Sequence, residues 1–437
     1  MRGESLVVML AAVAVAGCTT AVPAPGGPFS HAVVASSATA QGATPMLAVS
    51  PDGERILSWV AEDGDAAGAL HVEVTGPGGI VRGGVLRDPL GGIEPHGEAP
   101  PVVVAAGHGV IAALYTVGKD VGARFPASAL RFARSDDGGA TWRDPVSINE
   151  GETFGSHNFH ALLAGADGAL YAAWLRNVRG ESAVWLRPSR DGGLTWEAAR
   201  PVHEAPTCPC CRTGLALAPD GTLYSSWRKI FEGDVRDVVV AASRDGGTTW
   251  SDPARPRADD WVFPGCPHAG PSLRAGADGS VHIAWWTGKP GEAGVWYARS
   301  TDGGATWAAQ PIAIGERSSP AHVQLALAGS AVLVAWDDGL GDRPVVRLRA
   351  SGDGGTTFGE AIDVSDPAVA GTYPVLAVAA DSLTVAWTQV SDSTHRAMLA
   401  ARPDMSDPAA RMALPRVGQQ EVMVRRAAIA DLVRRGD

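Results

Sequence analysis

Four cysteines and several histidines stand at positions that suit a soft-metal site. The candidate ligands are Cys208, Cys210, Cys211, Cys266, His157 and His268. Thiolate sulfur with imidazole nitrogen binds zinc or copper, and sulfur favours Cu(I). In an oxidising compartment cysteines also form disulfides, so a Cys208–Cys266 bond is a second interpretation and a thiol redox role a third. Because a disulfide does not need the histidines, we expect copper or zinc, and otherwise no cofactor.

A repeated unit must position these residues. Residues 208–250 hold apolar runs separated by Gly-rich turns, which is typical of a small antiparallel sheet. The second run of each unit ends in an aromatic residue, and counting back 14 residues always reaches the start of the first run. The aromatic positions are Trp59, Tyr115, Trp174, Trp227, Trp285, Trp336 and Trp387. Seven such units predict an all-β, seven-bladed propeller of four-stranded antiparallel blades, with six blades as the alternative.

The same alignment predicts where the candidate ligands meet. In propellers the segment before each first strand lies at the mouth of the central channel. His157, Cys210 and His268 stand three residues before the aligned first-strand positions of units three, four and five. Cys208 and Cys266 stand five residues before them, as does His96 in unit two, while His160 and His322 occupy the aligned positions themselves. We therefore expect a Cys/His site at the channel mouth, with these last three histidines as weaker candidates.

Five octets close five of the units with nearly one pattern, Ser-x-Asp-Gly-Gly-x-Thr followed by Trp or Phe. They cover residues 135–142, 189–196, 243–250, 300–307 and 351–358. Aspartate can accept hydrogen bonds from turn N–H groups, and glycine tolerates positive φ. The pattern resembles the Asp-box, or BNR repeat, of the sialidase superfamily. The resemblance implies a structural, non-catalytic role for the box aspartates Asp137, Asp191, Asp245, Asp302 and Asp353.

The resemblance also implies an alternative function. Sialidases bind a carboxylate with three channel arginines and use a Tyr–Glu nucleophile pair with an Asp acid/base. The first strand here, Thr44-Pro45-Met46-Leu47, lacks the expected arginine, although Arg212, Arg274 and Tyr373 are placed to face the channel. We therefore expect a binding or metal-handling propeller. A sialidase-like exo-glycosidase or a non-catalytic glycan- or protein-binding propeller is the alternative, so enzyme activity stays open.

The chain ends predict an exported protein. Residues 1–18 have a short apolar core, too short to span a bilayer, and end in Val15-Ala16-Gly17-Cys18, which resembles a bacterial lipobox. We expect a lipidated Cys18, with an ordinary cleaved signal as the alternative. Residues 19–43 are expected to be a flexible linker, 44–415 the propeller, and 416–437 a short helical or frayed tail.

Cellular location and partners follow from these features and from charge. Thr19 after the lipobox favours the outer membrane, facing the periplasm, by family analogy. A net charge of −11 disfavours nucleic acid as a partner. We expect a monomer in the cell envelope whose partners are the membrane and a glycan or an envelope protein.

Overall fold

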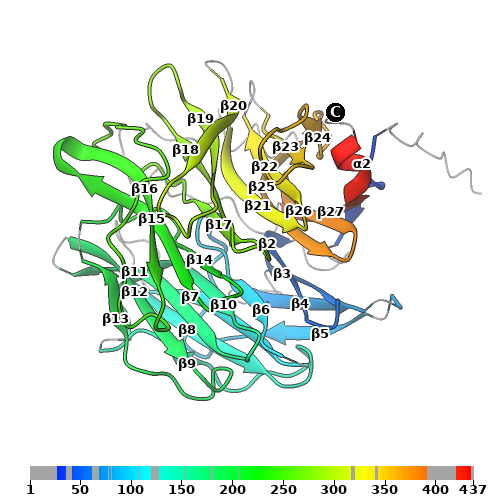
Figure 1. Cartoon of the computed structure of the whole chain (residues 1–437). Coiled ribbons are helices and arrows are strands. Elements are labelled where there is room, and N and C mark those ends of the chain that lie inside the picture. The colour runs from blue at the N-terminus through cyan, green and yellow to red at the C-terminus, as the bar shows by residue number, and fades with distance from the viewer. Residues whose placement is uncertain are drawn as a thin grey trace, which may run out of the picture.

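Seven antiparallel sheets form a ring in the computed structural model (Figure 1). It describes residues 27–35, 42–61, 68–76, 78–79, 81–107, 109–119, 127–151, 153–178, 181–204, 206–315, 320–339, 343–390 and 420–434. The first strands of the blades lie toward the centre of the ring, and each contacts the first strands of its neighbours. The predicted seven-bladed propeller is therefore confirmed. Cys18 lies outside the described residues.

The strand bounds follow the blades in chain order. Blades one to three contain β2 (Gly42–Val49), β3 (Arg55–Ala61), β4 (Ala69–Thr75), β5 (Val81–Leu86), β6 (Val102–Ala105), β7 (Ile111–Lys119), β8 (Ala127–Ser135), β9 (Val146–Ser147), β10 (Ser156–Ala164), β11 (Leu170–Val178), β12 (Glu181–Ser189) and β13 (Arg200–His203). Blades four to six contain β14 (Gly214–Leu217), β15 (Leu223–Phe231), β16 (Val235–Ser243), β17 (Ser272–Ala275), β18 (Val281–Thr287), β19 (Gly294–Ser300), β20 (Ala308–Ile314), β21 (Pro320–Ala328), β22 (Ala331–Asp338), β23 (Val345–Ser351) and β24 (Ile362–Asp363). The fourth blade has three strands, and two isolated bridges to β16, Val240–Ala254 and Val235–Val262, stand in the place of its fourth.

The seventh blade joins the two ends of the described chain. It contains β25 (Ala370–Ala379), β26 (Ser382–Val390), β27 (Gln420–Ala428) and β1 (Val33–Val34), with β1 as its outer strand. The short helix α2 (Ile429–Arg434) follows β27, and a 3₁₀ turn, η1 (Glu232–Asp234), lies between β15 and β16. The expected boundaries at 43 and 415 were therefore wrong, because part of the expected linker and most of the expected tail complete this blade. None of the helices in the described residues is long and apolar enough to cross a membrane.

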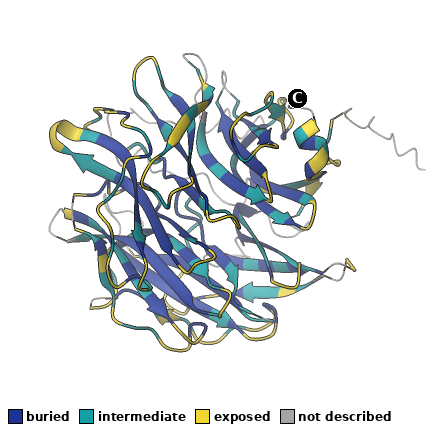
Figure 2. Cartoon of the chain, viewed as in Figure 1, coloured by how far each residue is buried: buried dark blue, intermediate teal, exposed yellow. Residues whose placement is uncertain are grey.

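The aromatic ladder packs between adjacent sheets. Five tryptophans of the ladder and Tyr115 are at most 1% exposed, and Trp59 is 5% exposed. Each hydrophobic cluster draws on neighbouring blades, as where Val72 of blade one packs with Tyr115 of blade two. Buried residues run along the strands and exposed ones gather at the turns (Figure 2). The core is thus a ring of interfaces around the axis.

The Asp-boxes form the structural turns that the resemblance implied. In the first box, Asp137 Oδ1 accepts hydrogen bonds from the Ser135 hydroxyl at 2.8 Å and from the Thr141 N–H at 2.9 Å. The Ser135 oxygen accepts from the Gly139 N–H at 2.8 Å, and Gly139 has a φ of 89°. The hydrogen bonds from Thr141 hold the pKa of Asp137 at about 2. The box aspartates therefore close turns far from the axis.

Four inner strands carry a β-bulge at the same place. The register shifts at Thr44 in β2, Phe159 in β10, His322 in β21 and Tyr373 in β25, and all four residues have φ between 47° and 55°. A left-handed backbone is costly for such residues, and it occurs mainly where the surrounding structure constrains it. Three of these bulges bring Thr44, His322 and Tyr373 to one pocket between the inner strands.

Candidate metal centre

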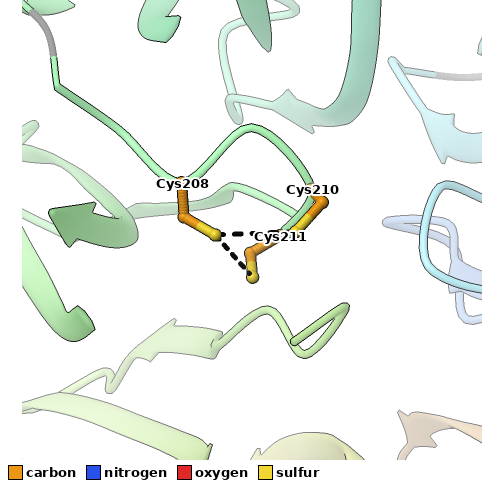
Figure 3. Close-up of side chains that lie close together, drawn as sticks. All are labelled: Cys208, Cys210 and Cys211. Carbon is orange, nitrogen blue, oxygen red and sulfur yellow. Dashed lines mark hydrogen bonds between the residues drawn. The ribbon is translucent and has the colours of Figure 1, made fainter. Parts of the chain in front are cut away.

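Three cysteine thiols meet in the segment between β13 and β14. Cys208 Sγ lies 3.6 Å from the sulfur atoms of both Cys210 and Cys211, and the three sulfurs lie within 4.8 Å of one another (Figure 3). The side chains are 0%, 5% and 1% exposed, respectively. A hydrogen bond of 2.9 Å from the Cys208 N–H to the Arg228 carbonyl fixes the start of the segment against β15. We call these three residues the thiol cluster.

Positive charge surrounds the first thiol of the cluster. Arg236 Nη1 lies 3.3 Å from Cys208 Sγ. Arg228 is fully buried, and its Nη1 donates to the Arg236 carbonyl at 2.8 Å. Hydrogen bonds from the other two cluster thiols lower the pKa of Cys208, and the charges of Arg228 and Arg236 lower it further. The cluster is therefore prepared to hold negative charge on sulfur.

The other two cluster thiols keep their protons more firmly. The hydrogen bond that Cys210 makes to Cys208 raises the pKa of Cys210. Burial raises the pKa of Cys211. A metal ion bound by all three sulfurs would displace the thiol protons that remain.

Cys266 lies next to the cluster but at the surface. It is exposed, and it lies close enough to Cys210 to raise the pKa of the Cys210 thiol. The four cysteines of the described residues are free thiols, so the alternative Cys208–Cys266 disulfide is not formed in this structure. His268 Nδ1 lies 3.2 Å from the Cys266 carbonyl oxygen, and the His268 ring stacks on His96 with 6.4 Å between centroids.

His157 and His160 occupy other surroundings on β10. Burial, followed by the charge of Arg176, lowers the pKa of His157 to about 4. Burial also lowers the pKa of His160, which is fully buried, to about 4. Among the described residues, the only group of three or more possible ligands whose ligand atoms lie this close is the thiol cluster. The structure thus brings together three of the six expected ligands, sets Cys266 and His268 beside them, and leaves His157 out.

A second polar cluster joins two residues that were expected at the channel, His322 and Tyr373, to two that were not predicted, Asp337 and Glu98. His322 Nδ1 lies 2.7 Å from Asp337 Oδ2, which also accepts from the Tyr373 N–H at 2.8 Å. His322 Nε2 lies 3.7 Å from Glu98 Oε1, and the Tyr373 ring lies 4.0 Å from the imidazole, centroid to centroid. We call His322, Asp337, Glu98 and Tyr373 the axial cluster. Asp337 directly follows the buried ladder residue Trp336, and this position could have indicated a carboxylate near the channel from the sequence.

The carboxylates Asp337 and Glu98 change the pKa values of His322 and Tyr373. Burial alone would lower the pKa of His322, but Asp337 and Glu98 outweigh it and raise that pKa. Burial, followed by the charges of Glu98 and Asp337, raises the pKa of Tyr373. The phenol therefore stays protonated at neutral pH and can donate a hydrogen bond.

Arg212 and Arg274 lie near this cluster, as expected for channel residues. Arg212 lines the axial pocket with Gln324, whose amide oxygen, in its better orientation, accepts from both Arg212 Nη atoms at 3.1 Å. Burial, and then the charge of Arg212, lowers the pKa of Arg274 to about 10. The pocket between the side chains is narrow, with room for about one water molecule.

Comparisons with known proteins agree with this architecture. Residues 92–282 match the BNR repeat-like domain. An ulvan lyase of polysaccharide lyase family PL25, bound to a -[GlcA(1-4)Rha3S]- ligand, shares the fold with a TM-score of 0.55 and 14% identity, over 82% of this chain and 93% of its own. A Dyadobacter fermentans protein of unknown function gives a TM-score of 0.53 and 15% identity, over 92% of this chain and 100% of its own.

A leech intramolecular trans-sialidase gives a TM-score of 0.50 and 12% identity, over 93% of this chain and 71% of its own. At these identities the structures establish the fold alone. No curated protein sequence matches the chain. The predicted resemblance to BNR propellers of the sialidase superfamily is confirmed by the domain match and by the fold.

Proposed function

Since the chain is a BNR-repeat propeller with the sialidase fold, its activity must be inferred from its own side chains, and we propose that it binds a soft metal ion at Cys208, Cys210 and Cys211. The observation that carries this proposal is the buried convergence of three thiols within 4.8 Å. Three sulfurs bound in one plane to an ion at about 2.3 Å lie about 4 Å from one another. The cluster therefore needs little rearrangement to accept one ion.

Cu(I) fits this donor set better than zinc. Soft thiolates favour Cu(I), and three of them complete a trigonal site. Structural zinc takes four ligands, so Zn(II) would also need the exposed Cys266. Arg228 and Arg236 offset the negative charge that three thiolates bring to one ion. The proposed role is metal binding or handling, with Zn(II) as the alternative ion.

The test is a metal titration of the reduced protein. Under anaerobic conditions, wild type should retain one Cu(I) per chain after gel filtration and bind it more tightly than Zn(II). A Cys210→Ser, Cys211→Ser double variant should lose this binding, whereas a His157→Gln variant, the matched control from the expected ligand set, should keep it. If wild type retains no metal and its thiols oxidise instead to disulfides, the proposal fails.

A second candidate function rests on the axial cluster. His322, paired with Asp337, and the protonated Tyr373 hydroxyl are groups able to act in acid/base chemistry, and Arg212 offers a cation for a carboxylate. The fold neighbour described as an ulvan lyase is bound to a -[GlcA(1-4)Rha3S]- ligand, so acidic glycans are the substrates to try. Sialylated and uronate-containing glycans should be cleaved by wild type and not by Tyr373→Phe. If wild type cleaves neither class of glycan, this second candidate function is refuted.

Export and anchoring complete the proposal. The motif Val15-Ala16-Gly17-Cys18 supports lipidation of Cys18 and attachment of the propeller to the outer membrane, facing the periplasm. Cys18→Ser should move the protein from the membrane fraction to the soluble fraction. A chain that stays in the membrane fraction with its first 17 residues uncleaved would contradict lipidation.

A further inference from the structure

The thiol cluster is closed to solvent, so an ion needs a path to it. Its side chains are at most 5% exposed, whereas Cys266 is exposed. The loop that carries Cys266 is linked to the cluster by Arg236, which donates to the Phe263 carbonyl and contacts Cys208 Sγ at 3.3 Å. Cys266 itself lies close enough to Cys210 to raise the pKa of that thiol, so an exposed sulfur stands beside the buried three.

We propose that Cys266 is the exchange ligand through which a soft metal ion enters and leaves the thiol cluster. The inference rests on the proposed metal-binding function and adds a route and a class of partner. A donor or acceptor that itself offers thiolates, such as a metal-carrying protein or a small thiol, fits this route. It can share the ion with an exposed sulfur but cannot reach a buried one.

The loop that carries Cys266 is held at both ends. Before Cys266, the Phe263 N–H donates to the Asp234 carbonyl at 3.1 Å, and the Phe263 carbonyl accepts from Arg236 Nε. After it, the Gly270 N–H donates to Glu98 Oε2 at 3.1 Å. Arg236 also contacts Cys208, so the same side chain links the loop to the thiol cluster. These contacts hold the loop that carries the exposed Cys266 against the thiol cluster.

Imidazole next to Cys266 gives the surface a second ligand type. His268 Nδ1 contacts the Cys266 carbonyl, an arrangement in which Nδ1 donates and Nε2 keeps a lone pair for an ion. His96 stacks on His268, and its Nδ1 is buried without a hydrogen-bond partner. A surface site made of the Cys266 sulfur and the His268 imidazole binds Cu(I) less strongly than three thiolates do. The ion therefore moves inward when it is delivered.

The transfer needs no change of oxidation state. As the ion arrives, a Cu–S bond to Cys266 forms while a Cu–S bond to the donor breaks, and the Cys266 proton passes to the released donor thiolate. In the next step Cys210 binds the ion, and its proton returns to Cys266 as that bond breaks. Cys208 and Cys211 then form the remaining two Cu–S bonds as any further donor thiolates leave, and the Cys211 proton passes to a released donor thiolate or to water. Copper stays Cu(I) throughout.

The experiment compares exchange rate with affinity in Cys266→Ser. Protein loaded anaerobically with one Cu(I) is mixed with reduced glutathione and bathocuproine disulfonate, and copper transfer is followed by absorbance. The variant should keep one Cu(I) per chain, with an affinity within about twofold of wild type, while transfer in and out slows at least tenfold. Val262→Ser, which replaces a 61%-exposed residue at the start of the same loop, should leave the rate unchanged.

Each other outcome overturns a different claim. Unchanged rates in Cys266→Ser, with copper retained, would refute the exchange role alone. Loss of stoichiometric binding in this variant would show Cys266 to be a permanent ligand, which also refutes it. If wild type itself retains no copper, the proposed function fails and the exchange role with it. Thermal melting of the variants confirms that each is folded, which is expected because Cys266 and Val262 are exposed.

Discussion

The Arg236 guanidinium lies 3.3 Å from the Cys208 sulfur, inside the fourth blade, with Nη1 as the donor. Arg236 is 8% exposed and Cys208 is fully buried, so water screens this contact only weakly. A charge-assisted hydrogen bond of this kind stabilises a thiolate, and the same charge stabilises a metal ion held by several thiolates.

Arg236→Gln should therefore weaken Cu(I) binding. We expect affinity to fall about tenfold, corresponding to about 1.4 kcal/mol. Competition with bicinchoninate measures the dissociation constant, and Arg244→Gln, at an exposed arginine of an Asp-box, is the control. Equal affinities for wild type and Arg236→Gln would show that the guanidinium does not act on the ion.

Trp227→Ala should destabilise the fourth blade. Trp227 is fully buried, and its ring lies 5.6 Å from that of His203, centroid to centroid. Truncation of a buried aromatic costs about 3–5 kcal/mol, because apolar contacts are lost and a cavity is left. Urea unfolding measures the change. Leu194→Ala, at a residue that is 52% exposed, should change stability by less than about 0.5 kcal/mol, and a similar loss in both variants would contradict the packing role of the ladder.

The repeated unit made the fold predictable. The predicted boundaries at 43 and 415 were wrong because β1 and β27, which lie outside them, do not show the repeat. Each aromatic residue of the ladder, from Trp59 to Trp387, stands 14 residues after the aligned first-strand position of its own blade. This spacing is constant because every blade buries the residue at that position. β27 is the third strand of its blade but has no Asp-box at its end, and β1 has only two residues, so neither carries the signature of a blade strand. β1 and β27 pair although they lie near opposite ends of the sequence, and a local sequence pattern does not indicate such long-range pairing.

The candidate site was predictable only in part, for a related reason. The alignment placed Cys210 and His157 in the same row, but it could not give the direction of each side chain. Thiols two and three residues apart in one segment meet locally, as in the thiol cluster. Glu98 reaches His322 from a non-repetitive loop of another blade, a contact that depends on the closed ring.

The Asp-boxes predict a specific loss of stability in acid. Hydrogen bonds, first from the Thr141 hydroxyl, lower the pKa of Asp137 from 3.8 to about 2 in the folded protein. A lowered pKa stabilises the fold at pH values above about 4, and this contribution disappears as pH falls toward 2. Asp137→Asn should therefore melt below wild type at pH 7, and the difference should shrink between pH 4 and 2. Calorimetry at several pH values checks this, and a gap that persists at pH 2 would point to altered geometry instead of lost charge.

The axial cluster predicts the opposite dependence on pH. The pKa of His322 is raised in the folded protein, where Asp337 and Glu98 overcome the effect of burial. The charged imidazole therefore contributes stability that is complete below the unfolded value of about 6.5 and is lost as pH rises through the higher folded value. Tyr373 also faces His322, and its raised pKa keeps the phenol protonated over this range. Arg212, which lines the same pocket, is the other charged group facing the imidazole.

His322→Gln should remove this dependence. The free energy of unfolding of wild type should exceed that of the variant most at pH 5.5–6, and the difference should decline steadily above pH 6.5. Urea unfolding at half-unit steps from pH 5.5 to 9 measures it, with His31→Gln as a control at an exposed histidine. Asp337→Asn should reduce the slope as well, because it removes the nearer of the two carboxylates, 2.7 Å from His322. If the free energies of unfolding of wild type and His322→Gln change in parallel with pH, the imidazole of His322 is neutral in the folded protein. That result would also contradict the acid/base role proposed for His322.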